Sequence, residues 1–195
     1  QDAYTYFFRG KVYANAQTGN IVLLSQHLFT GDFLTALHYL IPLVAFASGI
    51  LAAELFREHF QSLKALHWRQ MIVLAEILLL FSVGFFPQEL NLLANSIVSF
   101  SCAMQVQAFR KVNGYAFAST MCIGDLRSGV EAFCIWSKTH EPKVKDRMMR
   151  YFGIILLFAV GAGIGSMGAA RLAGKTIWIL SLIHISEPTR LQLIS

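Results

Sequence analysis

Charged residues are scarce in this chain. Asp, Glu, Lys and Arg make up only 14% of its 195 residues, whereas 55% are hydrophobic. Soluble domains carry about 25% charged residues, so the composition excludes an ordinary soluble or disordered chain. We therefore expect a membrane protein whose main partner is the lipid bilayer.

Residue patterns for metal binding, disulfide bonding or catalysis are also lacking. The three cysteines, Cys102, Cys122 and Cys134, are odd in number and have no CxxC spacing, which excludes a disulfide framework and a zinc site of that type. The histidines show no paired-ligand spacing, and no Ser, Thr or Cys has a base and an orienting group nearby in sequence. We expect buried free thiols, no cofactor, no metal and no enzymatic activity.

Long apolar runs are what the chain has in abundance. Residues 36–56, 70–86, 92–109 and 151–172 are each long enough to cross a hydrocarbon core of about 30 Å. Partial spans lie at both ends. These runs predict an all-α polytopic membrane protein with about six transmembrane helices in a single domain, residues 1–179.

The basic residues lie mainly beside the apolar runs. A net charge of +5 could suggest a nucleic-acid partner, but loop charges next to spans set membrane orientation. We therefore expect no nucleic acid. The basic segments 57–69 and 138–150 should be cytoplasmic, and the link 87–91, which lacks Lys and Arg, should lie on the opposite side.

This charge pattern also constrains the segments between the spans. If residues 115–136 enter the membrane and return, the basic run after them stays inside. The equivalent segment, residues 13–29, should then enter from the outer side. Arg9 and Lys11 would lie outside, a mild exception to the charge rule.

A polar, glycine-containing block occurs twice, each time after an apolar segment that ends in Phe-Arg. The first copy covers residues 8–20, and the second covers residues 109–120 and closes on Gly124-Asp125-Leu126. Duplicated polar breaks are typical of transporters with internal repeats, which bind their solute at the breaks. We predict two inverted three-helix repeats, residues 1–86 and 90–179.

The two polar blocks contain the candidate substrate-binding residues. Asn15, Gln17, Thr18 and Asn20 offer uncharged donors and acceptors, which suit a polar solute or an alkali cation. Gly19 and Gly124 would allow the backbone to break, and Thr18 or Asn20 would cap the following helix. Gln105, Thr120 and Asp125 are the candidates near the second copy. The alternative is that these residues only cap helices and satisfy the breaks.

Two carboxylates are candidates for proton or ion coupling. Asp2 lies near the first break, and Glu76 is the most isolated charge in an apolar run. A carboxylate at membrane depth is costly and usually functional. The alternative for Glu76 is a neutral, hydrogen-bonded acid that holds helices together.

Small residues follow each polar block, within residues 46–53 and 158–165. Gly161, Gly165 and Ala169 share one helix face, which lets backbones approach closely in lipid and permits a homodimer. At the chain ends, residues 2–8 look like the last part of a helix. A further span begins at Thr176, but residues 180–195 resemble a translated sequencing adapter and are expected to be a non-native tail.

Several motifs resemble the YoaK-like family of bacterial membrane proteins. They are Asp2-Ala3-Tyr4, the block from Asn15 to Asn20 with its Thr-Gly-Asn sequence, the run from Ala103 to Arg110, and Gly124-Asp125-Leu126. The likeness covers Asp2 to Ile179 and implies about six spans in the bacterial cytoplasmic membrane. The chain departs from the family pattern at Ile123, where a threonine usually precedes the glycine.

The sequence supports one functional hypothesis and one alternative. The preferred hypothesis is a small secondary transporter or permease for a small polar solute or ion, with its site at the duplicated breaks. The alternative is a membrane scaffold or sensor whose breaks serve helix packing.

Overall fold

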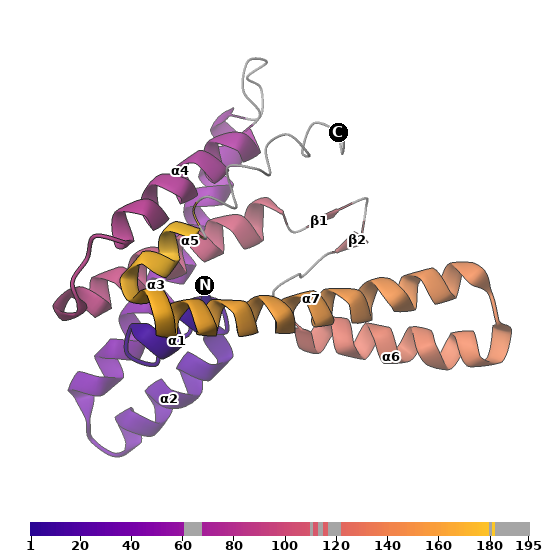
Figure 1. The fold of residues 1–195 in the computed structure, drawn as a ribbon, viewed down its shortest axis with the longest axis horizontal. Coiled ribbons are helices and arrows are strands. Elements are labelled where there is room, and N and C mark those ends of the chain that lie inside the picture. Colours follow the sequence, from indigo (N-terminus) through magenta and orange to yellow (C-terminus); the bar gives the residue numbers. More distant parts are fainter. Residues whose placement is uncertain (61–67, 110, 113–114, 117–121, 180, 182–195) are drawn as a thin grey trace.

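The protein is built from helices. The computed structural model describes residues 1–60, 68–109, 111–112, 115–116, 122–179 and 181 (Figure 1). Within these residues the α-helices are α1 Asp2–Phe8, α2 Gln17–Phe29, α3 Phe33–Phe60, α4 Trp68–Val83, α5 Asn91–Ala108, α6 Cys122–Thr139 and α7 Pro142–Leu172. The 3-10 helices are η1 Gln88–Leu90 and η2 Ala173–Lys175. The strands β1 Lys111–Val112 and β2 Tyr115–Ala116 form one short antiparallel pair. The predicted all-α class is confirmed.

The expected apolar spans coincide with helices. Residues 36–56 lie in α3, residues 92–109 match α5 closely, and residues 151–172 form the C-terminal part of α7. The basic segment 138–150 covers the end of α6, a short turn and the start of α7. Pro142 occupies the first turn of α7, where proline is favoured, and the Lys and Arg residues that follow are good helix formers. Most of the basic segment is therefore helical.

Each polar block is followed by two antiparallel helices joined by a tight turn. Helix α2 pairs with α3 through a turn at Gly31, and α6 pairs with α7 through a turn at His140, both of which have positive φ angles. Helix α6 and the N-terminal part of α7 extend away from the other helices, whereas the C-terminal part of α7 lies against α1 (Figure 1).

Helices α3 and α5 form the most extensive helix pair, and they cross at Gly49. A Cβ atom on Gly49 would lie 2.4 Å from the Phe100 carbonyl oxygen and 2.8 Å from the Ala103 Cβ. Only a glycine allows this approach of the two backbones. The expected packing role of small residues is thus seen in residues 46–53.

The small residues of α7 behave differently from one another. A Cβ on Gly165 would lie 3.4 Å from Ala3 of α1, and Ala169 is buried. Among the described residues, nothing lies within 4 Å of a Cβ on Gly161. The predicted packing face is therefore used at Gly165 and Ala169, where α7 packs on α1, but not at Gly161.

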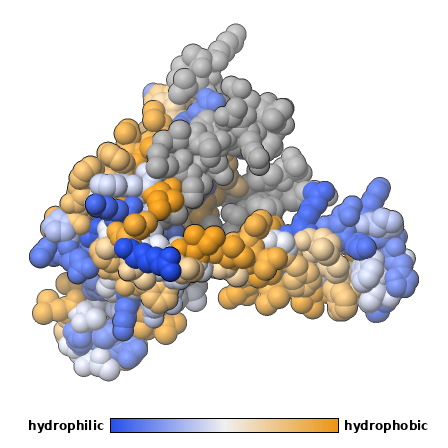
Figure 2. Space-filling view, in the orientation of Figure 1, coloured by the Kyte–Doolittle hydropathy of each residue, from blue (hydrophilic) through white to orange (hydrophobic). Residues whose placement is uncertain are grey.

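The surface is widely apolar. Large hydrophobic side chains are exposed along α2, α3, α4, α6 and α7, and Figure 2 shows hydrophobic residues along much of the α6–α7 hairpin. Two helical segments among the described residues, Phe33–Phe60 and Pro142–Ile179, are long and apolar enough to cross a membrane. Exposing this much apolar surface to water is unfavourable, so these helix faces are suited to contact with lipid.

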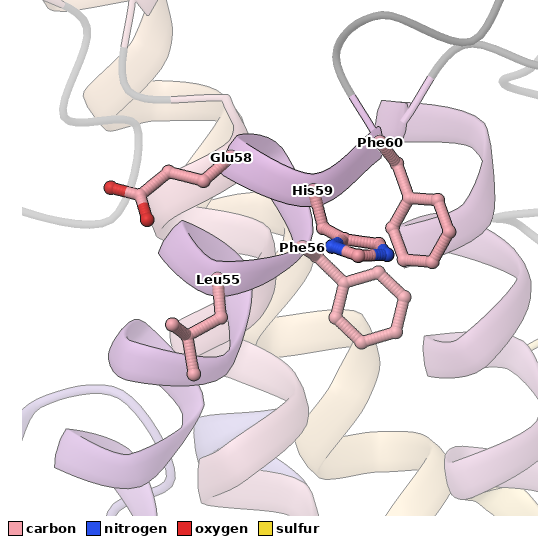
Figure 3. A pocket seen from close by; sticks show the side chains of 5 residues that line it. All are labelled: Leu55, Phe56, Glu58, His59 and Phe60. Carbon is pink, nitrogen blue, oxygen red and sulfur yellow. The ribbon is translucent and has the colours of Figure 1, made fainter.

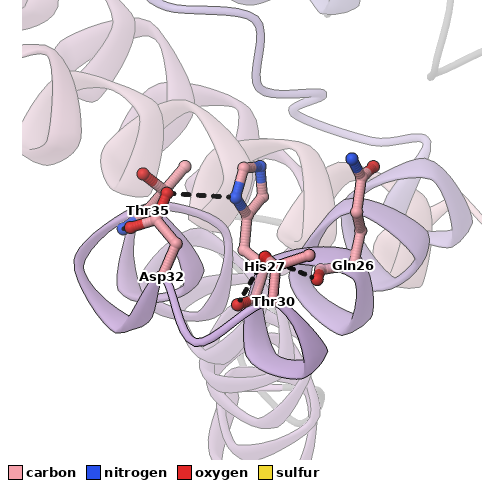
Figure 4. Close-up of polar contacts among 5 residues, drawn as sticks. All are labelled: Gln26, His27, Thr30, Asp32 and Thr35. Atoms are coloured by element: carbon pink, nitrogen blue, oxygen red, sulfur yellow. Dashed lines mark hydrogen bonds and ion pairs between the residues drawn. The ribbon is translucent and has the colours of Figure 1, made fainter.

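Asp32 caps the start of α3 (Figure 4). Its Oδ1 accepts the Thr35 backbone N–H at 3.2 Å, and its Oδ2 lies 3.2 Å from His27 Nδ1 of α2. The hydrogen bonds with Thr35, and secondarily His27, hold the pKa of this carboxyl below its usual value. The capped turn fixes how the α2–α3 hairpin is closed.

Replacing Gly49 with alanine should destabilise the protein. The added methyl group must displace backbone atoms of α5, and overpacking of this kind costs about 1–3 kcal/mol. The matched control is Gly161→Ala, where the space is open and the better helix propensity of alanine is neutral or favourable. Thermal unfolding of both variants in detergent checks this. Equal unfolding midpoints for the two variants would contradict the close crossing of α3 and α5 at Gly49.

The Asp32 cap should make the stability of the hairpin depend on pH. Because the pKa is lower in the folded state, the contribution is present above the ordinary aspartate pKa and is lost as pH falls through the folded pKa. Asp32→Asn should keep the cap at neutral pH but remove the loss of stability at low pH. Unfolding midpoints measured between pH 3 and 7 test it, and an unchanged pH profile would disprove the assignment.

Candidate functional site

Arg9, which follows α1, is a fully buried cation. Among the described residues no carboxylate bonds its guanidinium. Instead it donates to Tyr4 Oη (2.9 Å), Val83 O (3.1 Å), Pro87 O (3.1 Å) and Asn91 Oδ1 (3.2 Å). Val83 is the last residue of α4, where the helix dipole favours a positive charge. Carbonyl and amide oxygens thus replace a counter-ion.

Further contacts fix the same region. Asn95 of α5 donates its side-chain N–H to the Arg9 backbone oxygen at 2.7 Å. Trp178 donates its indole N–H to Phe81 O at 3.1 Å and lies directly over Gly84, where a Cβ would be 1.8 Å from its Nε1. The end of α4 is therefore held by one side chain near the start of the chain and one near the end of its described part.

The first break, residues 10–16, folds back along α1. Gly10 and Lys11 both have positive φ angles, 92° and 62°, which reverses the chain direction just after Arg9; glycine adopts such angles without strain. The Tyr13 ring stacks on Tyr6 at 4.6 Å. At the far end of the break, the Asn15 backbone N–H donates to Asp2 Oδ1 at 2.7 Å. Helix α2 therefore starts beside the first turn of α1.

The amide side chains of the first copy close this loop. Asn20 is buried and bonds both backbone groups of Tyr13, at 3.0 Å to its N–H and 2.7 Å to its oxygen. Gln17 accepts from Asn20 at 2.9 Å and donates to Ala14 O at 2.8 Å. These groups satisfy one another and the break.

The expected helix cap is wrong. Helix α2 begins at Gln17, with Ala16 as its N-cap and no side-chain cap hydrogen bond. Thr18 lies within the first turn and is exposed, and Asn20 reaches back to Tyr13 instead. Gly19 is also helical and lies under the Tyr13 ring, 2.9 Å from where its Cβ would be. The Thr-Gly-Asn sequence thus starts the helix, and the irregular backbone precedes it.

A buried polar layer lies between α1, α4 and α5, and we define it as Gln1, Glu76 and Cys102, which are linked by hydrogen bonds. Glu76 is fully buried and accepts a hydrogen bond from the Gln1 side chain at 3.1 Å. Cys102 donates to the same Gln1 side chain. Ser99 and Ser101 are fully buried, and their hydroxyl oxygens have no hydrogen-bond partner among the described residues.

Apolar clusters flank this layer on both sides. On one side Leu80 and Val83 of α4 cluster with Ala94 and Val98 of α5. On the other side the cluster contains Ile72 of α4 with Met104 and Ala108 of α5. Glu76 lies between Ile72 and Leu80, and the serines lie between Val98 and Met104. The polar layer therefore lies between two apolar parts of one helix interface, and its Cys102 also packs in the first cluster.

The candidates of the second copy lie elsewhere. Gln105 is half-buried on α5, and Gly124 and Asp125 lie in the first turn of α6, so Gly124 does not break a helix. Asp125 is buried, and its Oδ2 has no hydrogen-bond partner among the described residues. Thr120 and residues 182–195 of the expected tail lie outside the described residues. The first-copy candidates pack around α1, whereas Gly124 and Asp125 belong to the α6–α7 hairpin.

An open hollow lies at the C-terminal end of α3, lined by Leu55, Phe56, Glu58, His59 and Phe60 (Figure 3). The Glu58 carboxylate points away from the His59 ring in this view. No acid–base pair is formed there. Among the described residues, no group of three His, Cys, Asp or Glu side chains is placed to hold a metal ion.

Sequence reasoning missed four polar groups of this region. They are Arg9 as a buried residue, Asn95, Ser99 and Ser101. The spacing of Asn95, Ser99 and Cys102, at i, i+4 and i+7 within an apolar run, places them on one helix face. That pattern could have indicated a polar stripe facing a neighbouring helix.

Comparison with known proteins agrees with this membrane architecture. The family described as "Protein of unknown function (DUF1275)" matches residues 1–186. The chain belongs to this family. It is also similar to the UPF0700 transmembrane protein YoaK of Bacillus subtilis (strain 168), with 26% identity over 188 residues, 91% of this chain and 82% of that protein. No solved structure matches. The predicted family resemblance is confirmed, and the protein is a membrane protein.

Arg9→Met should strongly destabilise the protein, because it removes the donor of four hydrogen bonds, of which those to Tyr4 Oη and Val83 O are buried. Hydrogen bonds to charged groups contribute about 1.5–3 kcal/mol each, although losses in one network do not add. Arg9→Lys should retain only part of the lost stability, because a lysine ammonium cannot reproduce the hydrogen-bond geometry of the planar guanidinium. Arg171→Met, at an exposed position of α7, is the control. Unfolding midpoints in detergent measure this, and a midpoint for Arg9→Met equal to that of Arg171→Met would contradict the clamp.

Proposed function

We propose that the protein is a small, non-enzymatic secondary transporter of the bacterial cytoplasmic membrane, which moves a small polar solute or cation. The observation that carries the proposal is the buried polar layer. An ionisable residue at membrane depth is costly and marks an ion or proton path in many transporters. Two buried serine hydroxyls with no partner among the described residues, those of Ser99 and Ser101, lie at the same level of α5 on different faces of the helix.

The position of the layer supports this role. Glu76 is the ninth of the 16 residues of α4, and Ser99 is the ninth of the 18 residues of α5. If both helices span the bilayer, these side chains lie near its midplane. Transporters bind substrates and coupling ions at that depth.

The first break adds a second element to the proposal. Helix α1 ends at the α4–α5 link, the break returns along α1, and α2 starts beside Asp2. We infer that residues 10–29 enter the membrane and return to the side they came from. The order of helix, break and helical hairpin occurs again from α5 to α7, which supports two repeats. Their inversion and the total of six spans remain part of the proposal.

The geometry shifts the proposed solute path toward the polar layer. The side-chain amides of Gln17 and Asn20 are engaged with each other and with the break, which favours the alternative role of scaffold or sensor for that loop. Asp2 joins the two regions, since it holds the break while the neighbouring Gln1 bonds Glu76. We therefore assign coupling to Glu76 and Asp2, and solute contacts to the groups around them.

Proton flux through proteoliposomes tests the assignment. A pH-sensitive dye is trapped inside, and a potassium diffusion potential drives protons inward. We expect flux above that of protein-free vesicles, abolished by Glu76→Gln, which keeps the shape but cannot ionise. Glu58→Gln, at an exposed site of α3, should leave the flux unchanged. Wild-type flux equal to that of empty vesicles would favour the scaffold alternative.

Ser99→Ala separates transport from folding. The Ser99 hydroxyl has no partner among the described residues, so its removal should change stability by less than about 0.5 kcal/mol or raise it. The same variant should reduce flux in the proteoliposome assay if the hydroxyl lines the path. Normal flux together with normal stability would exclude Ser99 from it.

A further inference from the structure

The outer end of the α6–α7 hairpin concentrates positive charge. We define the hairpin tip as residues 138–150, which carry five basic and two acidic side chains, a net charge of +3. The basic residues are Lys138, Lys143, Lys145, Arg147 and Arg150, and all are exposed. Figure 2 shows hydrophilic residues gathered at this end of the hairpin. In the described part of the tip, no ion pair neutralises any of them.

Trp136 anchors the base of the tip. Its ring lies 6.0 Å from Lys145 Nζ and 5.8 Å from the His140 ring, and its backbone oxygen accepts the His140 N–H at 2.8 Å. An indole held between a lysine and a turn is the arrangement expected at the level of lipid headgroups. This contact also holds Lys145 in place.

Apolar side chains begin within one or two helical turns of the charges. Phe133 and Ile135 are exposed on α6, and Met149 is exposed on α7. Farther along α7, Leu156 and Leu157 are also exposed. Only 6% of the most apolar stretch of Pro142–Ile179 is buried inside the protein. The basic tip thus borders an apolar surface that suits acyl chains.

We propose that the hairpin tip binds the phosphate groups of anionic phospholipids. Charge complementarity supports this partner, because juxtamembrane Lys and Arg side chains are attracted to anionic lipid surfaces. The neighbouring apolar faces distinguish a lipid from a soluble anion, since only a lipid occupies both surfaces at once. The preference is for lipids with net negative charge, such as phosphatidylglycerol, over zwitterionic phosphatidylcholine.

Lipid retention measures this preference. The full chain is placed in nanodiscs that contain phosphatidylcholine and phosphatidylglycerol, and native mass spectrometry counts the lipids retained. Lys143→Gln with Arg147→Gln should lower the selectivity for phosphatidylglycerol by roughly 30-fold at low salt, at about 1 kcal/mol per charge. Lys145 is left intact because it contacts Trp136.

A matched double variant provides the control. Arg171→Gln with Lys175→Gln removes the same two charge types at the other end of α7, where both residues are exposed, and should leave selectivity within about twofold. Equal losses in both double variants would show a general charge effect and overturn the assignment to the tip. Displacement of the lipid by millimolar inorganic phosphate would identify a soluble anion site instead. Unfolding midpoints exclude misfolding as a cause.

Discussion

The bonding of one buried guanidinium determines how the rest of the interior is arranged. A helix as short as α1 is not stable by itself, and Arg9 joins it to the end of α4 and the start of α5. A buried charge is tolerated only when its hydrogen bonds are made, so α1 is held in one position. That position places the Gln1 side chain next to Glu76 and Asp2 next to Asn15.

The interior combines apolar clusters with a polar layer in the same group of helices. Apolar clusters hold α4 and α5 together above and below the polar layer, and Gly49 brings α3 close to α5 near the same level. Close packing on both sides restricts the polar side chains to a narrow zone. A proton or cation that reaches Glu76 would therefore be surrounded by a small and fixed set of groups.

Local properties of the sequence predicted the helices better than the contacts. Hydropathy and length identified α3, α5 and the apolar part of α7, because both are properties of contiguous residues. The charge of residues 138–150 predicted a side of the membrane but not a backbone conformation, and these residues are mostly helical. The buried environment of Arg9 depends on acceptors more than 70 positions away, which no local pattern encodes. The roles of Thr18 and Asn20 as caps failed because the break ends one residue before α2, at Ala16.

The indole of Trp178 over Gly84 has a consequence for biosynthesis. The two residues are 94 positions apart in the chain, and translation at about 5–20 residues per second separates their emergence by roughly 5–20 s. During that interval the end of α4 has Arg9 but lacks the tryptophan. The first four helices can therefore assemble during translation. The packing at the end of α4 is completed only when Trp178 has been synthesised.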